Sequence, residues 1–305
     1  MPTHVLKVKE EFHHARLDVF LAKNLADVPS RTFVRKLIDH GYVKVNESMV
    51  KAHHKIATGD DVWVDIPDNF FEPSYASPEN IAINIFYEDE NIFVIHKPSG
   101  MLVHPARGRH SGTLVNALLH HTNQLSDINS NIRPGIVHRL DEDTSGLILV
   151  AKDNITHARL AKQFQQHRIH KEYVALVQGS VEFDEGVIDA PLGRDYRHPE
   201  KKSVQFSDSA KEAKTFYRVL RRYQNISLVS LFPQTGRTHQ LRVHMAYLKH
   251  PILGDEKYGQ KRTFARLALH AKAIGFQHPI SKKYIEFSTL TPKEFLQAVH
   301  APGIN

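Results

Sequence analysis

One short charged segment of this chain lies between two apolar runs, and its carboxylate is a candidate for chemistry. The segment is His138-Arg139-Leu140-Asp141, and an apolar run follows it at residues 147–151. A loop fixed at both ends by buried segments can hold a side chain in place, because packing offsets the entropy cost of ordering it. Asp141 could therefore form a turn, pair with Arg139 or act as a catalytic carboxylate, and this segment alone leaves all three roles open.

A second segment, residues 235–248, predicts a helix that carries an arginine at the edge of the core. Its apolar side chains at Leu241, Met245 and Leu248 recur at helical spacing. Thr238 is the expected N-cap of this helix. Arg242 directly follows the first of these leucines, so it lies beside the buried stripe, where it is well placed to pair with a carboxylate.

Four motifs occur in a fixed order along the chain. They include residues 91–105, the Asp141 segment with Thr144-Ser145-Gly146, the strand start Lys171-Glu172-Tyr173, and residues 236–244. Together they resemble the RluA-type family of pseudouridine synthases, over residues 82 to 296. The resemblance implies an enzyme that breaks the uridine N1–C1′ bond, turns the base and joins its C5 to C1′. It implies no metal and no other cofactor, because the reaction oxidises nothing.

The resemblance also implies catalytic roles for three residues. Asp141 would meet the positive character on the ribose by attacking C1′, by stabilising the charge or by abstracting a C2′ proton, and the sequence does not choose among these. Because burial favours the protonated form of a carboxyl group, Arg242 would keep this carboxylate ionised. Tyr173 would lie against the base and help to move its C5 proton, although an ordinary strand tyrosine is the alternative.

Six further residues are expected to contact the substrate. Arg139 resembles the family's turn arginine, which is linked to flipping the target nucleotide out of the helix. A phosphate contact or a salt bridge to Asp143 is the alternative role for this arginine. Leu241 would form an apolar wall under the uracil, or else be plain helix core. The remaining substrate-binding residues implied by the motifs are His138, Thr144, Arg237 and His239.

Residues 1–72 are predicted to form a separate small domain that resembles the S4 RNA-binding module. The resemblance rests on Ser30-Arg31, a basic helix, residues 41–46 and a late Gly59-Asp60 turn before a strand. Residues 16–55 hold eight basic and four acidic side chains, a net charge of +4. Arg31 and Arg35 would share one helix face and touch phosphates together, unless that face is simply solvated. The predicted RNA-binding residues are Arg16, Arg31, Arg35, Lys36 and Lys44.

The rest of the chain is predicted to be a flexible connector, residues 73–81, and a catalytic domain, residues 82–305. A helix is expected from Ile155 to His167, with Ala158, Ala161 and Phe164 as its apolar stripe. Strand signals that begin with polar turns and recur close together favour an antiparallel or mixed sheet with flanking helices. The predicted fold class is therefore α+β, and the resemblance implies the pseudouridine synthase fold with a cleft across the sheet.

Composition limits the possible partners and compartments. The chain has 305 residues, a formal charge of +7 and a pI near 9.4, which favour a polyanionic partner such as RNA. It has no cysteine, as suits a reducing cytosol, and no apolar run of membrane-spanning length. Although 22 histidines invite a metal site, neither their spacing nor their neighbours match one. These features fit a cytoplasmic monomer, and the family resemblance implies that it acts on large-subunit (23S) ribosomal RNA or on the assembling large subunit.

Two other functions are compatible with the sequence. A carboxylate-based nucleoside hydrolase would use Asp141 with a second acid, Glu142 or Asp143, although neighbours on one turn are poorly placed for opposite faces of a sugar. A non-catalytic RNA-binding or ribosome-assembly factor would retain the fold without the chemistry. The hydrolase would release free uracil, and the binding factor would keep its function without Asp141.

Overall fold

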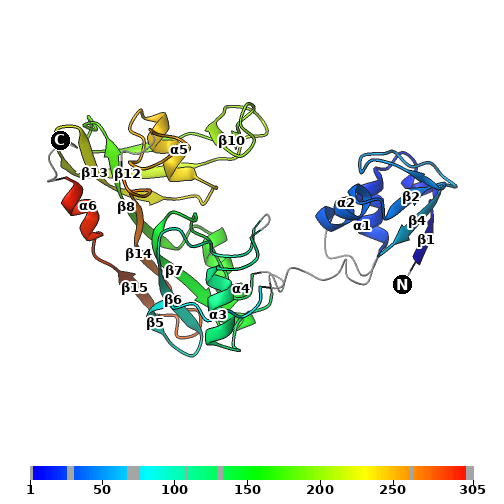
Figure 1. Cartoon of the computed structure of the whole chain (residues 1–305), viewed down its shortest axis with the longest axis horizontal. Coiled ribbons are helices and arrows are strands. Elements are labelled where there is room, and N and C mark those ends of the chain that lie inside the picture. The colour runs from blue at the N-terminus through cyan, green and yellow to red at the C-terminus, as the bar shows by residue number, and fades with distance from the viewer. Residues whose placement is uncertain are drawn as a thin grey trace. The chain divides into compact units, whose positions relative to one another are not determined.

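The computed structural model describes residues 3–25, 31–66, 76–106, 109–128, 133–260 and 264–299. The chain forms two compact units, Met1–Pro73 and Ser74–Asn305, whose elements are labelled in Figure 1. None of the helices in these described ranges is both long and apolar enough to span a bilayer.

The smaller unit is a four-stranded antiparallel sheet with two α-helices. Its elements are β1 (Thr3–Lys7), the 3-10 helix η1 (Glu10–Phe12), α1 (Leu17–Asn24), α2 (Arg31–Asp39), β2 (Val43–Val45), β3 (Ser48–Met49) and β4 (Asp61–Asp65), with strand order β1-β4-β2-β3. Val43 and Val45 are buried while Lys44 is exposed, so the predicted alternation is confirmed. Gly41 follows α2 with φ of +80°, as expected of a helix-ending glycine. Ser30, the predicted N-cap of α2, lies outside the described residues.

The larger unit is built on a nine-stranded mixed sheet. Its order is β5-β6-β7-β14-β8-β13-β12-β9, with β15 also paired to β14. These strands are β5 (Asn84–Glu88), β6 (Ile92–Lys97), β7 (Ser145–Ala151), β8 (His170–Gln178), β9 (Glu185–Asp189), β12 (Lys214–Arg222), β13 (Ile226–Pro233), β14 (Leu269–Gln277) and β15 (Tyr284–Ser288). A separate hairpin joins β10 (Leu192–Arg194) to β11 (Lys202–Val204). Among the described strands only β7 and β14 pair in parallel, and the predicted α+β class is confirmed.

Two helices cover opposite faces of this sheet beside β6 and β7. Phe93 and Ile95 of β6 share a core with α3 (Leu114–His121), whereas Ile92 and Val94 share another with Leu160 of α4 (Asn154–Gln165). Because strand side chains alternate between faces, the two cores lie on opposite sides of the sheet. Every residue of β7 is consequently buried, which explains its continuous apolar run. The other helices are α5 (Gln240–Tyr247) and α6 (Lys293–Ala298).

Two predicted helix details were wrong. Helix α4 buries Thr156, His157 and Leu160, while Ala158 and Ala161 are exposed. The large leucine sets the buried face, and alanines tolerate either environment. Thr238 does not cap α5. The N-cap is His239, with φ of +58° and no side-chain cap.

Part of the predicted connector packs against the larger unit. Ala76 is 4% exposed and belongs to the core beside α3, and the Asn116 side-chain amide donates to the Ser77 carbonyl over 2.8 Å. Residues 73–75 lie outside the described ranges. The predicted domain limits therefore stay a prediction, with residues 76 and 77 held by the larger unit.

Gly146 allows β7 and β14 to meet directly behind the Asp141 turn. Its φ is +114°, and it pairs with Ala271 of β14. A Cβ at this position would overlap the Ala271 backbone, so no other residue fits without displacing a strand. The turn is thereby anchored to the centre of the sheet.

Candidate active site

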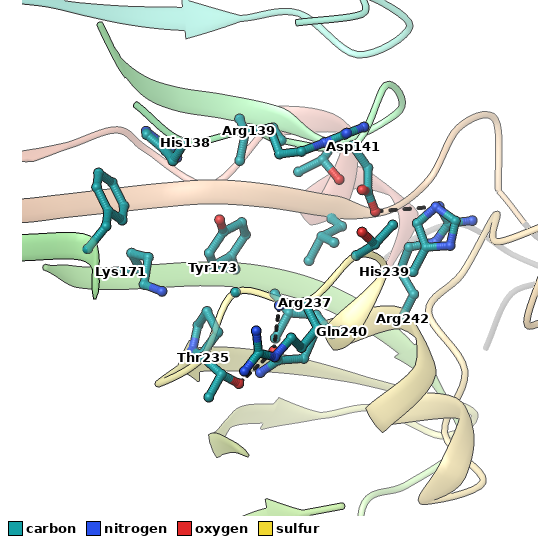
Figure 2. Close-up of a pocket in the computed structure, with 18 of the residues that line it drawn as sticks. His138, Arg139, Asp141, Lys171, Tyr173, Thr235, Arg237, His239, Gln240 and Arg242 are labelled. Carbon is teal, nitrogen blue, oxygen red and sulfur yellow. Dashed lines mark hydrogen bonds and ion pairs between the residues drawn. The ribbon is translucent and has the colours of Figure 1, made fainter. Parts of the chain in front are cut away.

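A cavity of about 570 Å³ collects the predicted catalytic and substrate-binding residues of the larger unit (Figure 2). Its lining includes Asp141, Tyr173, Arg242, Arg139, Leu241, His138, Thr144, Arg237 and His239. It lies where two hydrophobic cores meet, because Tyr173 packs against both. The size is within the range of small-molecule sites. Segments far apart in the sequence thus converge on one space.

Asp141 and Arg242 form an ion pair in the wall of the cavity (Figure 2). Asp141 Oδ2 lies 3.6 Å from Arg242 Nη1, and the two side chains are 16% and 5% exposed. Arg242 makes shorter contacts with Asp255, which accepts from Nε and Nη2 over 2.7 Å each. Burial opposes the charge of Arg242, but the hydrogen bonds and charge of Asp255, with the charge of Asp141, raise the pKa of the guanidinium. The guanidinium is therefore a permanent cation held from behind by a buried acid.

Tyr258 completes the wall behind this ion pair. Its ring centre lies 5.2 Å from the Arg242 guanidinium carbon. Its oxygen accepts from the Lys202 amide over 2.9 Å and lies 2.7 Å from His239 Nδ1. Since the amide can only donate, the phenol hydrogen is available to His239. Burial raises the pKa of Tyr258 to about 12, so the phenol stays protonated at neutral pH.

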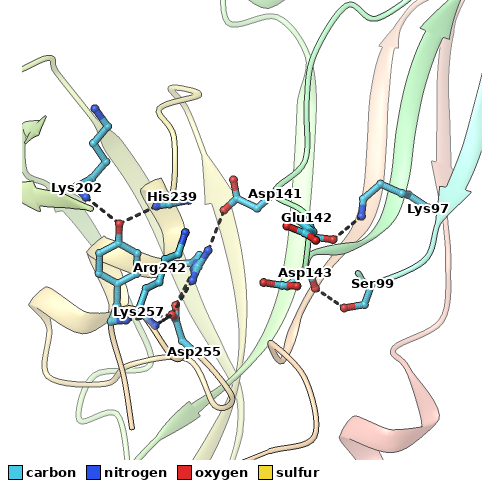
Figure 3. A network of polar contacts seen from close by, with 11 residues as sticks. Lys97, Ser99, Asp141, Glu142, Asp143, Lys202, His239, Arg242, Asp255 and Lys257 are labelled. Carbon is cyan, nitrogen blue, oxygen red and sulfur yellow. Dashed lines mark hydrogen bonds and ion pairs between the residues drawn. The ribbon is translucent and has the colours of Figure 1, made fainter. Parts of the chain in front are cut away.

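A buried lysine fixes the backbone of the Asp141 turn (Figure 3). The Lys97 side chain is 0% exposed, and its Nζ donates to the carbonyls of Pro98, Met101 and Glu142 over 2.7–2.8 Å. Ser99 adds a hydrogen bond to the Asp143 carbonyl over 2.7 Å. Burial lowers the pKa of Lys97 to about 8. Lys97 and Ser99 consequently hold the turn through its backbone carbonyls and do not occupy the Asp141 carboxylate, which can face the cavity.

His138 and Thr144 support the same turn from its two ends. His138 Nε2 accepts from the Leu149 amide over 2.9 Å, and its ring stacks on Phe164 at 4.7 Å. Burial lowers the pKa of His138 to about 3, so the ring is neutral and the hydrogen is on Nδ1. The Thr144 amide donates to the Asp141 carbonyl over 3.1 Å and closes the turn. Both residues line the cavity, but these contacts are structural.

Arg139 and Arg237 lie exposed at the rim of the cavity. Among the ion pairs of the described residues, none joins Arg139 to Asp143; the nearby pairs are Arg109 with Glu142 and Arg242 with Asp141. Arg237 donates from Nε to the Glu212 carbonyl over 3.0 Å. Leu241 is 7% exposed, lines the cavity and also belongs to the core, so its position fits both expected roles.

Tyr173 is placed beside the carboxylate at the junction of the two cores. Burial raises the pKa of its phenol, and the negative charge of Asp141 raises it further. The hydroxyl is therefore protonated at neutral pH and can donate a hydrogen bond or a proton.

Sequence reasoning missed four charged or polar groups of this site, namely Lys97, Lys171, Tyr258 and Asp255. A local signal existed for two of them. Lys97 ends a buried strand, and Asp255 follows an apolar segment at residues 251–253, so each is a charge next to a core segment. Neither pattern reveals the partner.

Comparison with known proteins identifies the family. A family model described as RNA pseudouridylate synthase matches residues 91–247, and an S4 domain model matches residues 15–62. Ribosomal large subunit pseudouridine synthase D of Zymomonas mobilis is 41% identical, over 96% of both chains. The chain belongs to the RNA pseudouridine synthase family. An uncharacterized RNA pseudouridine synthase of Bacillus subtilis, YlyB, is 43% identical over 96% of both chains.

Solved structures agree with this assignment to the pseudouridine synthases. Human RNA pseudouridylate synthase domain containing 1 has a TM-score of 0.58 and 25% identity, and the match covers 73% of this chain and 97% of that one. Residues 104–105, 112–120 and 134–137 resemble those of pseudouridine synthase D, and several relatives of that name are 35–41% identical to this chain.

The predicted RNA-binding residues of the S4 unit differ in whether they already pair with an acidic side chain. Arg16 and Arg31 both bind the buried carboxylate of Asp18, over 3.0 and 2.9 Å. Arg31 therefore forms an ion pair with Asp18, whereas the prediction had Arg31 and Arg35 contacting phosphates together. The side chains of Arg16 and Arg31 are still half exposed, at 45% and 52%. Arg35, Lys36 and Lys44 are exposed.

A metal site is not found in the described ranges, where no group of three or more histidine or acidic side chains is arranged to hold an ion. The pairs of adjacent histidines in the sequence accordingly give no candidate centre there.

Proposed function

We propose that this protein converts specific uridines of large-subunit (23S) ribosomal RNA to pseudouridine, with Asp141 as the reacting carboxylate. One observation carries the proposal. Asp141 is the only carboxylate among the described residues that line the cavity, and it lies 3.6 Å from the buried Arg242. A single charged acid with a fixed cation suits cleavage and re-formation of one bond to the sugar.

The reaction begins with the target uridine in the cavity. Breaking N1–C1′ leaves positive character on the ribose, and the Asp141 carboxylate meets it by bonding to C1′, by charge stabilisation or by removing the C2′ proton. The detached uracil turns so that its C5 faces C1′, and the new C5–C1′ bond forms as any bond between Asp141 and C1′ breaks, or as a proton taken from C2′ is returned to it. The C5 proton leaves and N1 regains a proton, so no atom is lost from the nucleoside.

Three neighbours assist this sequence. Arg242 stabilises the carboxylate whenever it is charged. Tyr173, protonated beside Asp141, lies against the base and relays the C5 proton. Leu241 supplies an apolar surface on which the uracil can turn. At the exposed rim, Arg139 takes part in flipping the target nucleotide or binds its phosphate, and Arg237 and His239 hold the RNA nearby.

The hydrolase alternative lacks a second acid in the described cavity. Glu142 pairs with Arg109 over 2.7 Å, and neither Glu142 nor Asp143 is among the lining residues. Two carboxylates flanking the sugar would be needed. A non-catalytic binding factor would have no use for the ion pair of Asp141 and Arg242, since burying it costs desolvation energy.

The smaller unit and the cellular location complete the proposed function. The S4 unit would hold the RNA through Arg16, Arg31, Arg35, Lys36 and Lys44, either on free ribosomal RNA or on an assembling large subunit. We propose a cytoplasmic monomer that uses no metal or cofactor, because the isomerisation needs neither oxidant nor reductant.

The test maps pseudouridine in ribosomal RNA from cells with and without this protein, and then with the Asp141→Asn variant. We expect specific sites to vanish without the protein and to stay absent with the variant, which should still bind RNA. Glu142→Gln is the matched control, because it removes a neighbouring acid outside the cavity, and it should restore every site. Normal modification by Asp141→Asn would end the assignment, and release of free uracil would favour a hydrolase.

A further inference from the structure

A second hollow of about 670 Å³ adjoins the catalytic cavity. The two share His167, Lys171, Pro233 and Thr235 as lining residues, so they adjoin where β8 begins and β13 ends. Figure 2 shows Lys171 and Thr235 along the part of the catalytic cavity away from Arg242. A polymer whose target nucleotide occupies the first space could therefore extend into the second.

One wall of this hollow is aromatic. Two of its lining residues, Phe232 and His170, have rings 6.0 Å apart, and Phe216, which does not line the hollow, packs behind them at 5.6 Å from Phe232. Phe232 is half-buried and His170 is exposed, so parts of both rings remain open to a ligand. Open ring faces at the edge of a binding cavity are surfaces on which nucleobases stack, whatever their sequence.

The charge of Lys171, at the junction of the two spaces, has no carboxylate in reach among the described residues. The other lysine of the hollow, Lys214, lies 3.3 Å from Asp189. Lys171 is half-buried, and burial lowers its pKa to about 8. Keeping an unpaired ammonium in such a place is unfavourable unless an anion arrives with the substrate. In RNA, a phosphate lies between each pair of neighbouring nucleosides.

We propose that the second hollow is a subsite for the nucleotide next to the target uridine. Its base stacks on Phe232 and His170, and the phosphodiester between the two nucleotides contacts Lys171. This inference rests on the proposed function and names a part of the substrate that the catalytic cavity alone does not hold.

The first test removes the base rather than the side chain. A hairpin RNA carrying a mapped target as [5-³H]uridine is made intact, and with an abasic nucleotide on the 5′ or the 3′ side of that uridine. Tritium release then gives kcat/KM. We expect one of the two abasic RNAs to react about tenfold more slowly with the wild-type protein, since stacking on one aromatic side chain has about that effect.

The protein variants decide whether that loss comes from the hollow. Phe232→Ala should react about tenfold more slowly with intact RNA and show no further loss with the abasic RNA. Phe232→Tyr should restore both values, and Phe183→Ala, an exposed phenylalanine outside both spaces, should behave as wild type. Thermal unfolding of each variant separates these effects from misfolding.

These measurements distinguish failure of the proposed function from failure of the subsite. If intact RNA releases no tritium with the wild-type protein, the proposed function fails. If it does, but neither abasic RNA is slower, or the losses from Phe232→Ala and the abasic site multiply, the subsite is wrong while the function stands.

A salt titration tests the phosphate contact separately. Lys171→Met should lower the slope of log Kd against log salt by about 0.7 to 0.9, the value of one phosphate contact. Lys283→Met removes an exposed lysine outside both spaces and should leave the slope unchanged. An unchanged slope for Lys171→Met would overturn the contact.

Discussion

Replacing Lys97 by methionine tests whether the catalytic turn is held through its backbone. Methionine nearly keeps the shape of the buried side chain and removes the ammonium that reaches three carbonyls, including that of Glu142. Lys97 forms no hydrogen bond with the Asp141 carboxylate, although the two charges attract each other, so the main expected change is in the position of the carboxylate. We expect both stability and turnover to fall.

The size of the stability loss follows from two opposing effects. The pKa of about 8, against 10.5 for a free lysine, means that the charge at pH 7 is disfavoured by about 3 kcal/mol in the folded protein. Three hydrogen bonds from a charged donor contribute about 1.5–3 kcal/mol each, or about 4.5–9 kcal/mol together. The contribution of the hydrogen bonds exceeds the cost of burying the charge. Lys97→Met should therefore lower the free energy of unfolding by about 1–6 kcal/mol.

The effect of pH gives Lys97 a distinct signature. Between pH 8 and 10.5 the unfolded chain binds more protons at this residue than the folded one, so stability rises with pH. Urea unfolding should show that the wild-type protein gains about 2 kcal/mol more than Lys97→Met between pH 7 and 9.5. Lys171 has the same pKa direction, but it contributes equally to both proteins.

The kcat of Lys97→Met measures whether the position of the catalytic turn matters for activity. A shift of the turn by about 1 Å would reduce kcat about 100-fold, because reacting atoms must meet within a narrow range. Lys152→Met is the matched control, since Lys152 Nζ is bound to Glu88 and to the Asp89 carbonyl at a site away from the cavity. A folded Lys97→Met protein with wild-type kcat would refute the argument.

Three other predictions test the supports of the site. Asp255→Asn should lower the free energy of unfolding by about 3–5 kcal/mol and reduce turnover, because Arg242 loses its buried counter-charge; urea unfolding within about 1 kcal/mol of wild type would contradict this. Because the pKa of His138 is about 3 in the folded protein, its contribution to stability is retained above pH 6.5 and lost as the pH falls below that value. Between pH 6.5 and 5 the free energy of unfolding of the wild-type protein should fall by up to about 2 kcal/mol more than that of His138→Gln. The amide oxygen of this variant can still accept the hydrogen bond from the Leu149 amide. Gly146→Ala should destabilise by about 3 kcal/mol or more in the same assay, since a Cβ would overlap the backbone of β14, and a loss below about 1 kcal/mol would show that the strands can separate.

The sequence predicted the residues that belong to continuous motifs. Asp141 and Arg242 each occur in a recognisable segment, and the structure brings them within 3.6 Å. Asp255 could not be predicted in the same way. It lies 13 residues from Arg242, and the two hydrogen bonds between them depend on how the chain returns after α5. Local patterns contain no information on such a return.

Helix details failed for a related reason. The predicted stripe of α4 relied on Ala158 and Ala161, whose small side chains carry little burial energy, whereas Leu160 decides the buried face. The predicted Thr238 cap was plausible in isolation. In the structure the side chain of Gln240 accepts from the Arg237 amide over 3.0 Å, which satisfies the start of α5 differently. Periodicity predicts that a helix exists better than it predicts how the helix begins.

The unequal contacts of Arg242 suggest why the site contains a second buried acid. A guanidinium binds a carboxylate most strongly as a two-pronged fork. In this site that fork is occupied by Asp255, over 2.7 Å on both sides, while Asp141 is left with one longer contact of 3.6 Å. If the fork held Asp141 instead, both of its oxygens would be committed before the ribose arrived. Asp255 thus keeps the cation in place and leaves the oxygens of Asp141 available to the substrate.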